Sequence, residues 1–181
     1  EDTFDDTNLM LESLKDFNIP HIVGGVFPIN APEVCLDSPN INVISRYEGE
    51  LVIRDVINCF KKGEDWKHTK GLWYKEDGKI IKNPLQPLCD INDIIPDFSL
   101  YDPVRFNRPI GGHIRTTIQF ETYRGCPYSC TFCNSPTTRA MDKNYLRRKR
   151  IEQVEKELDY YMKNFDPEFW FITDDSFLAR P

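Results

Sequence analysis

Apolar residues recur at helical spacing in three segments of the chain. The segments cover residues 5–17, 50–62 and 145–164. Apolar positions three and four residues apart fall on one face of an α-helix, so each segment predicts an amphipathic helix. The predicted apolar faces are Met10, Leu11, Leu14 and Phe17 in the first, Val52, Ile53, Val56, Ile57 and Phe60 in the second, and Ile151, Val154, Leu158, Tyr161, Met162 and Phe165 in the third.

Shorter apolar runs between these helices predict β-strands at residues 20–25, 41–47, 113–122 and 169–173. Residues 71–82 predict a β-hairpin that turns at Asp77-Gly78, because this dipeptide suits a two-residue hairpin loop. From residue 83 to 112 the periodicity is lost and prolines recur at positions 84, 87, 96, 103 and 109. That composition indicates an extended linker.

The order of elements indicates an α/β fold in three parts: residues 1–70, a hairpin and linker over 71–112, and residues 113–181. The first part is typical of the C-terminal end of a doubly wound, Rossmann-like domain, and the last part predicts one right-handed βαβ unit. In doubly wound sheets, ligands bind at the carboxyl ends of the strands. Five candidate ligand-binding residues fall at such ends: Gly24, Gly25, Glu48, Gly49 and Glu50.

Composition narrows the class of protein. Hydrophobic residues make up 40% of the 181 positions and charged residues 29%, no apolar run approaches the ~20 residues of a membrane span, and no basic and apolar leader is present. We expect a cytoplasmic protein without membrane insertion or secretion. A net charge of −6 argues against a nucleic-acid partner. Because the chain begins without methionine and stops after a predicted strand, we expect an internal fragment.

Three of the six cysteines lie close together. Cys126, Cys130 and Cys133 have the spacing C-x-x-x-C-x-x-C. Their thiolates can bind three irons of a four-iron cluster, since thiolate is the soft ligand that such iron prefers. The fourth iron would stay open to a small molecule with an amine and a carboxylate. The spacing differs from that of a ferredoxin and lacks the second pair of ligands of a structural zinc site.

The longer run over residues 121–134, Glu-Thr-Tyr-Arg-Gly-Cys-Pro-Tyr-Ser-Cys-Thr-Phe-Cys-Asn, resembles radical S-adenosylmethionine (SAM) enzymes. It is most similar to the subgroup in which a cobalamin-binding domain precedes the radical SAM domain. The Gly24-Gly25 and Glu48-Gly49-Glu50 segments resemble the end of such a cobalamin-binding domain. In this reading, residues 1–70 end the cobalamin-binding domain and residues 113–181 open a partial (β/α) barrel.

The resemblance implies a 4Fe-4S cluster on the three cysteines, and SAM beside Phe132, Asp174 and Asp175. It implies a 5′-deoxyadenosyl radical and cobalamin-dependent methyl transfer to an unactivated carbon. A reductant such as flavodoxin or ferredoxin would supply electrons, and the substrate would be a small molecule that can be anionic. The family's cobalt-ligating histidine would precede residue 1, so we expect these 181 residues to be inactive by themselves.

Two alternatives stay open on the sequence. A methylthiotransferase acting on tRNA or a ribosomal protein shares a similar loop and needs three more cysteines, for which Cys35, Cys59 and Cys89 are available. A non-catalytic binding module would hold zinc with the three clustered cysteines and His113 or His68. The basic run over residues 139–150 predicts either ion pairs with glutamates of the following helix or contact with an anionic substrate.

Overall fold

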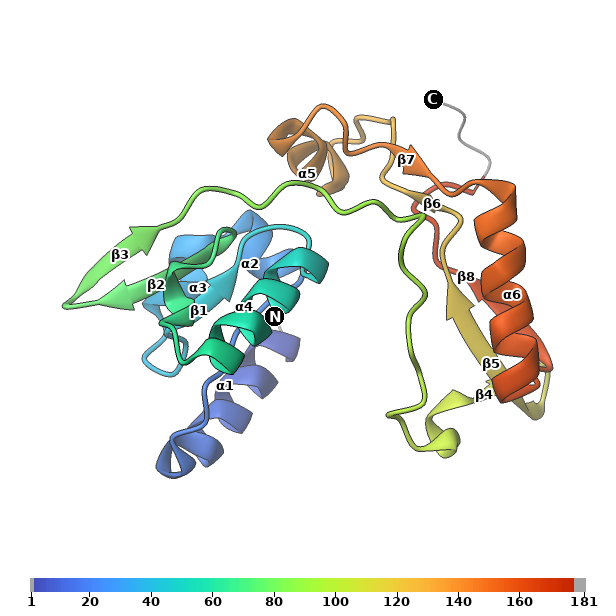
Figure 1. The fold of residues 1–181 in the computed structure, drawn as a ribbon, viewed down its shortest axis with the longest axis horizontal. Coiled ribbons are helices and arrows are strands. Elements are labelled where there is room, and N and C mark those ends of the chain that lie inside the picture. The colour runs from blue at the N-terminus through green and yellow to red at the C-terminus, as the bar shows by residue number, and fades with distance from the viewer. Residues whose placement is uncertain (1, 178–181) are drawn as a thin grey trace. The chain divides into compact units, whose positions relative to one another are not determined.

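The computed structural model describes residues 2–177 of the chain. The chain folds into two compact units, Glu1–Cys89 and Asp90–Pro181 (Figure 1). The division lies inside the range 71–112 that was predicted to link two domains. Within the described residues, no helix is both long and apolar enough to span a lipid bilayer.

The first unit contains six helical elements within its described residues. The helix predicted over residues 5–17 is present over residues 2–17, with an α-helical part and a final 3₁₀ turn. The helix predicted over residues 50–62 is confirmed at both ends. Gly63 ends this helix with a φ of 68°, and its N–H bonds back to the last turn. The helical elements are α1 (Asp2–Leu14), η1 (Lys15–Phe17), α2 (Val26–Asn30), α3 (Pro32–Asp37), α4 (Glu50–Lys62) and η2 (Trp66–His68).

The sheet of the first unit has the order β1-β2-β3, with β1 (Val43–Ser45), β2 (Leu72–Glu76) and β3 (Lys79–Lys82). The predicted hairpin and its turn are confirmed, since β2 pairs with β3 across residues 77–78. Because β2 also pairs antiparallel with β1, the hairpin belongs to this sheet and not to a linker. The strand predicted over residues 20–25 is reduced to one parallel bridge between Val23 and Ile44.

Strand β1 is buried on both faces, because successive side chains of a strand point to opposite sides. Val43 packs into one cluster with Val52 and Val56 of α4, and Ile44 packs into a second cluster with Cys35 and Leu36 of α3. The first unit is therefore an α/β arrangement with helices on both faces of its sheet. The predicted apolar face of α4 is only partly buried, as its remaining members Ile53, Ile57 and Phe60 are about half exposed.

The second unit contains the predicted βαβ unit. Strand β5 (His113–Phe120) runs parallel to β8 (Phe169–Ile172), and α6 (Ile151–Phe165) connects them along one face, as Figure 1 shows. Four elements were missed: β4 (Asn107–Ile110) pairs with β5 inside the predicted linker, α5 (Ser135–Met141) follows the cysteines, and β6 (Tyr123–Arg124) pairs with β7 (Arg147–Arg148). The short element η3 (Pro103–Phe106) precedes β4.

Helix α6 begins at Ile151, six residues after the predicted start, because residues 147–148 pair with β6 as a strand. Its inner face is also partly different. Tyr161 is fully buried against Ile118 and Phe120 of β5, whereas Ile151 and Met162, predicted to face inward, are 73% and 49% exposed. The polar residues Gln153 and Glu157 are buried in their place.

Candidate functional site

The three clustered cysteines lie on a loop at the carboxyl end of the parallel strands. The loop follows β5 and β6 and precedes α5, so its position after the first strand of the βαβ unit is as predicted. All three are free thiols: Cys126 is half-buried, and Cys130 and Cys133 are exposed. Phe132 between them is 91% exposed. The loop thus presents its thiols and this aromatic ring outward.

Asp174 fixes the chain just before this loop. Its Oδ1 accepts hydrogen bonds from the backbone N–H of Thr122 at 2.6 Å and of Tyr123 at 3.0 Å, and its Oδ2 accepts one from the Thr122 hydroxyl. Asp174 follows β8, so the carboxyl ends of the two parallel strands are joined here. Both oxygens bond within the chain, and the predicted contact of Asp174 with SAM stays a prediction.

Asp175 lies beside the start of the cysteine loop. Loss of hydration raises the pKa of its carboxyl, and the negative charges of Glu121 and Asp174 raise it further. A hydrogen bond from the backbone N–H of Gly125 partly opposes this shift. The predicted role of Asp175 toward SAM is likewise untested, but its carboxyl faces the loop that carries Cys126.

Arg139 of α5 donates hydrogen bonds to three residues of the cysteine loop. Its Nη1 donates to the carbonyl oxygens of Cys126 at 2.9 Å and Tyr128 at 3.2 Å, and its Nη2 donates to the Ser129 hydroxyl at 2.8 Å. This role was not predicted, since Arg139 stood in a basic run that predicted ion pairs with the following helix or contact with an anionic substrate. A short helix directly after the cysteines was the missing element.

Gly125 lets the chain turn into the loop. Its φ of 95° lies in the region that favours glycine, and a Cβ at this position would lie 2.9 Å from Cδ1 of Tyr145 and 3.0 Å from Cδ2 of Leu146. The backbone before Cys126 is therefore packed directly against residues 145–146. A larger residue would displace the loop.

The backbone around Cys133 favours its thiolate. The N–H of Cys133 donates to the Cys130 carbonyl at 3.2 Å, and the N–H of Ser135 donates to the Cys133 sulfur at 3.4 Å. The hydrogen bonds from Ser135 lower the pKa of the Cys133 thiol. Because the thiolate is the form that binds metal, the loop is prepared for a metal at this position.

The donor set fits an iron–sulfur cluster better than a single zinc ion. Within the described residues, the sulfur atoms of Cys126, Cys130 and Cys133 do not all lie within 4.8 Å of one another. A tetrahedral zinc with Zn–S bonds of about 2.3 Å would hold thiolates roughly 3.8 Å apart, whereas a cube of iron and sulfide is larger. His113 begins β5, and the cysteine loop lies beyond the other end of this strand. At about 3.3 Å per residue the two ends of β5 are roughly 23 Å apart, so His113 is poorly placed as a fourth zinc ligand.

The residues predicted to contact cobalamin lie together at one edge of the first sheet. The N–H of Ser45 donates to the Val23 carbonyl at 2.9 Å, so Gly24-Gly25 and Glu48-Gly49-Glu50 follow two adjacent parallel segments. Gly25 has a φ of 97°, and a Cβ at Gly25 or Gly49 would meet nothing within 4 Å. This edge therefore offers open backbone that a large ligand could approach.

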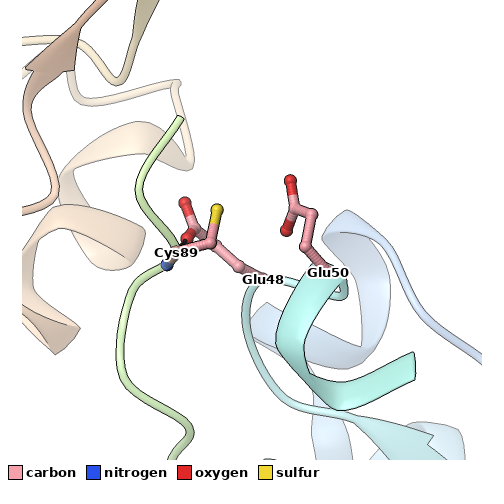
Figure 2. Close-up of side chains that lie close together, drawn as sticks. All are labelled: Glu48, Glu50 and Cys89. Carbon is pink, nitrogen blue, oxygen red and sulfur yellow. Dashed lines mark hydrogen bonds between the residues drawn. The ribbon is translucent and has the colours of Figure 1, made fainter. Parts of the chain in front are cut away.

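Cys89 joins this edge, which the sequence did not indicate. Figure 2 shows Glu48 and Glu50 at the start of α4 and Cys89 on the chain that follows the hairpin. The N–H of Cys89 donates to Oε2 of Glu48 at 3.1 Å, and a ligand atom of each of the three residues lies within 4.8 Å of the others. Cys89 is buried, but its sulfur lies close to the carboxylates of Glu48 and Glu50 and not in an apolar core. Acidic groups at such spacing are common without an ion.

Comparisons with known proteins identify relatives that match part of this chain. An uncharacterized methyltransferase of Pyrococcus horikoshii is 34% identical over 119 residues, covering 65% of this chain and 26% of the relative. The anaerobic magnesium-protoporphyrin IX monomethyl ester cyclase of Rubrivivax gelatinosus is 26% identical over 177 residues, covering 91% of this chain and 30% of the relative. No family model matches the chain.

A solved structure is similar over nearly the whole chain. The cobalamin-dependent SAM radical enzyme OxsB, with aqua-cobalamin and SAM bound, matches 99% of this chain with a TM-score of 0.63 and 25% identity. The chain covers 24% of OxsB, and it spans between a quarter and a third of the length of these relatives. By sequence this chain is similar to a methyltransferase and a cyclase, and by fold it is similar to a cobalamin-dependent SAM radical enzyme.

Proposed function

We propose that this chain is part of a radical SAM enzyme that holds a 4Fe-4S cluster on Cys126, Cys130 and Cys133. The observation that carries the proposal is the cysteine loop itself: three free thiols on a loop that is braced at the carboxyl ends of two parallel strands. Barrel enzymes place their chemistry at this end of the strands. The whole enzyme would use the 5′-deoxyadenosyl radical for cobalamin-dependent methyl transfer to an unactivated carbon.

The cluster, when bound, supplies a low-potential electron to the sulfonium of SAM. The chain's own residues position it. Arg139 and Asp174 hold the loop against the strand ends, and the N–H of Ser135 supports Cys133 as a thiolate. Phe132, exposed beside the third cysteine, is proposed to lie against the adenine of SAM.

The first unit is proposed to be the C-terminal part of a Rossmann-like cobalamin-binding domain. Its support is the open edge formed by Gly24-Gly25 and Glu48-Gly49-Glu50, together with the similarity to OxsB. The second unit is proposed to open a partial (β/α) barrel. We further propose a small-molecule substrate and an electron donor such as flavodoxin or ferredoxin, acting in a reducing compartment.

The position of the other cysteines does not support a methylthiotransferase. Cys35 of α3 is fully buried in the core, Cys59 lies on α4 near Thr69, and Cys89 lies beside Glu48. The three occupy separate places in the first unit, whereas a second cluster would need them on one loop or one edge. The similarity to the methyltransferase of Pyrococcus horikoshii supports methyl transfer. The similarity to the cyclase of Rubrivivax gelatinosus supports cyclisation as the second candidate reaction.

Anaerobic reconstitution tests the proposal. We expect about four irons per chain, visible charge-transfer absorption, and an electron paramagnetic resonance (EPR) signal that changes when SAM is added. Alanine at each of Cys126, Cys130 and Cys133 should remove the bound iron, while alanine at Cys59 should not. Iron content that survives these three substitutions, or an EPR signal that ignores SAM, would contradict the assignment.

A further inference from the structure

Tyr123, three residues before Cys126, carries a buried hydroxyl that has no hydrogen-bond partner among the described residues. The residue is only 5% exposed. Its backbone is fixed on both sides, because it pairs with Arg148 in the β6–β7 ladder and its N–H donates to Asp174. A buried hydroxyl without a partner disfavours folding, and phenylalanine would fill the same space without that cost.

The surroundings of the Tyr123 ring indicate what the hydroxyl faces. Loss of hydration raises the pKa of this phenol, and the charges that raise it further are those of Cys126 and Asp175. Cys126 is the first cysteine of the loop, and the carboxyl of Asp175 accepts a hydrogen bond from Gly125 beside it. The phenol therefore lies near the start of the cysteine loop, and at neutral pH it is a hydrogen-bond donor.

We propose that the hydroxyl of Tyr123 donates a hydrogen bond to the sulfur atoms of the cluster at Cys126, either the thiolate or the adjacent sulfide. The inference rests on the proposed function, because it requires the cluster to be bound. The partner that the hydroxyl lacks in the chain would be supplied by the cluster. Tyr123 would thus be a positioning residue that acts on the cluster and not on the substrate.

The consequence of this bond is a higher reduction potential. One-electron reduction adds one negative charge to the cluster and its thiolates, with no bond broken. A donor at the sulfur atoms stabilises the more negative, reduced form more than the oxidised form, and hydrogen bonds to sulfur are among the factors that set cluster potentials. Removing the donor should make the cluster harder to reduce.

The test compares Tyr123→Phe with the wild-type chain and with Tyr128→Phe as a matched control. Tyr128 is a tyrosine of the same loop, but it is 58% exposed. We expect Tyr123→Phe to lower the equilibrium constant for cluster reduction roughly tenfold, a negative shift of about 59 mV for one electron. Tyr128→Phe should leave the potential unchanged. Proton ENDOR spectra of the reduced cluster should lose one exchangeable coupling in Tyr123→Phe alone.

Unfolding of the cluster-free chain separates this role from a structural one. If the hydroxyl lacks a partner in the chain, Tyr123→Phe without the cluster should unfold at the same or a higher urea concentration than the wild type. A lower unfolding midpoint, or failure to fold, would show that the hydroxyl bonds within the protein, for example to Asp175, and would overturn the inference. A folded variant that no longer retains the cluster would support it.

The outcomes also distinguish this inference from the proposed function. A wild-type chain that assembles no cluster would overturn both. An intact cluster with the same potential and the same ENDOR couplings in wild type and Tyr123→Phe would overturn the role of Tyr123 and leave the cluster assignment standing.

Discussion

A buried ion pair holds the start of α6 next to the cysteine loop. Nζ of Lys149 lies 2.6 Å from Oε1 of Glu157, and their side chains are 3% and 0% exposed. Gln153 donates a longer bond of 3.4 Å to the same oxygen, while the other oxygen of Glu157 has no partner among the described residues. The backbone N–H of Lys149 donates to the carbonyl of Thr122, so the pair adjoins the residue that Asp174 anchors.

Replacing Lys149 with methionine should leave Glu157 as an unpaired charge at a fully buried position. Breaking a buried pair from one side costs about 3–5 kcal/mol, because the desolvation of the remaining charge is no longer offset. That would be a large share of the stability of a unit of this size. The double variant Lys149→Met/Glu157→Leu removes both charges, and we expect it to recover stability to within about 1 kcal/mol of the wild type or above it.

The free energy of unfolding can be measured by urea titration, with hydrogen exchange of the amides in β5 and α6 as the readout. Both elements lie wholly in the second unit. Lys163→Met, at an exposed position of the same helix, is the control and should change the free energy of unfolding by less than about 0.5 kcal/mol. The reasoning would be refuted by a Lys149→Met variant that loses less than about 1 kcal/mol. A double variant as unstable as the single one would also refute it, because packing and not charge would then decide the cost.

Three further predictions concern the loop. Gly125→Ala should lower the free energy of unfolding by at least about 1–2 kcal/mol, because φ is positive at this position and the new Cβ would meet Tyr145. Gly111 also has a positive φ but open space around it, so Gly111→Ala should lose only the free energy that the backbone conformation costs. Urea unfolding of both variants measures the difference. Arg139→Gln should weaken cluster retention roughly 10–100-fold through loss of its bonds to the loop carbonyls, measured as iron released to a chelator, and unchanged retention would contradict the bracing role. Asp175→Asn should stabilise the cluster-free chain at neutral pH. The raised pKa of the Asp175 carboxyl in the folded state opposes folding above the unfolded pKa of about 3.9 and has no effect on stability below it. A gain in stability that persists in acid would be inconsistent with this cause.

Periodicity in the sequence was sufficient for the main elements, because burial of an apolar face decides them. It located α4 at both ends, the turn at residues 77–78, and the parallel pair of β5 and β8. It failed where backbone pairing competed with helix formation. Residues 147–148 have helix-forming side chains, but pairing with β6 keeps them extended, and this delays α6 and turns Ile151 outward.

The loop that carries the candidate ligands could be located from the sequence, but the contacts that support the loop could not. A cysteine spacing is a local pattern, so three residues were enough to name the loop. Arg139, Asp174 and Cys89 act through backbone atoms or neighbours far away in the chain, and such contacts leave no local pattern. The ion pair of Lys149 with Glu157 was anticipated in kind, as pairing between the basic run and the following helix, but not its burial.

The bond from Asp174 to Thr122 has a consequence for how the protein matures. The two residues are separated by 52 positions in the chain, and β8 must align with β5 before they can meet. While the cysteines of a nascent chain have left the ribosome but Asp174 has not, the cysteine loop therefore lacks its hydrogen bonds to Asp174. For the proposed cluster, iron delivery would therefore follow both the release of the second parallel strand from the ribosome and the folding of this unit.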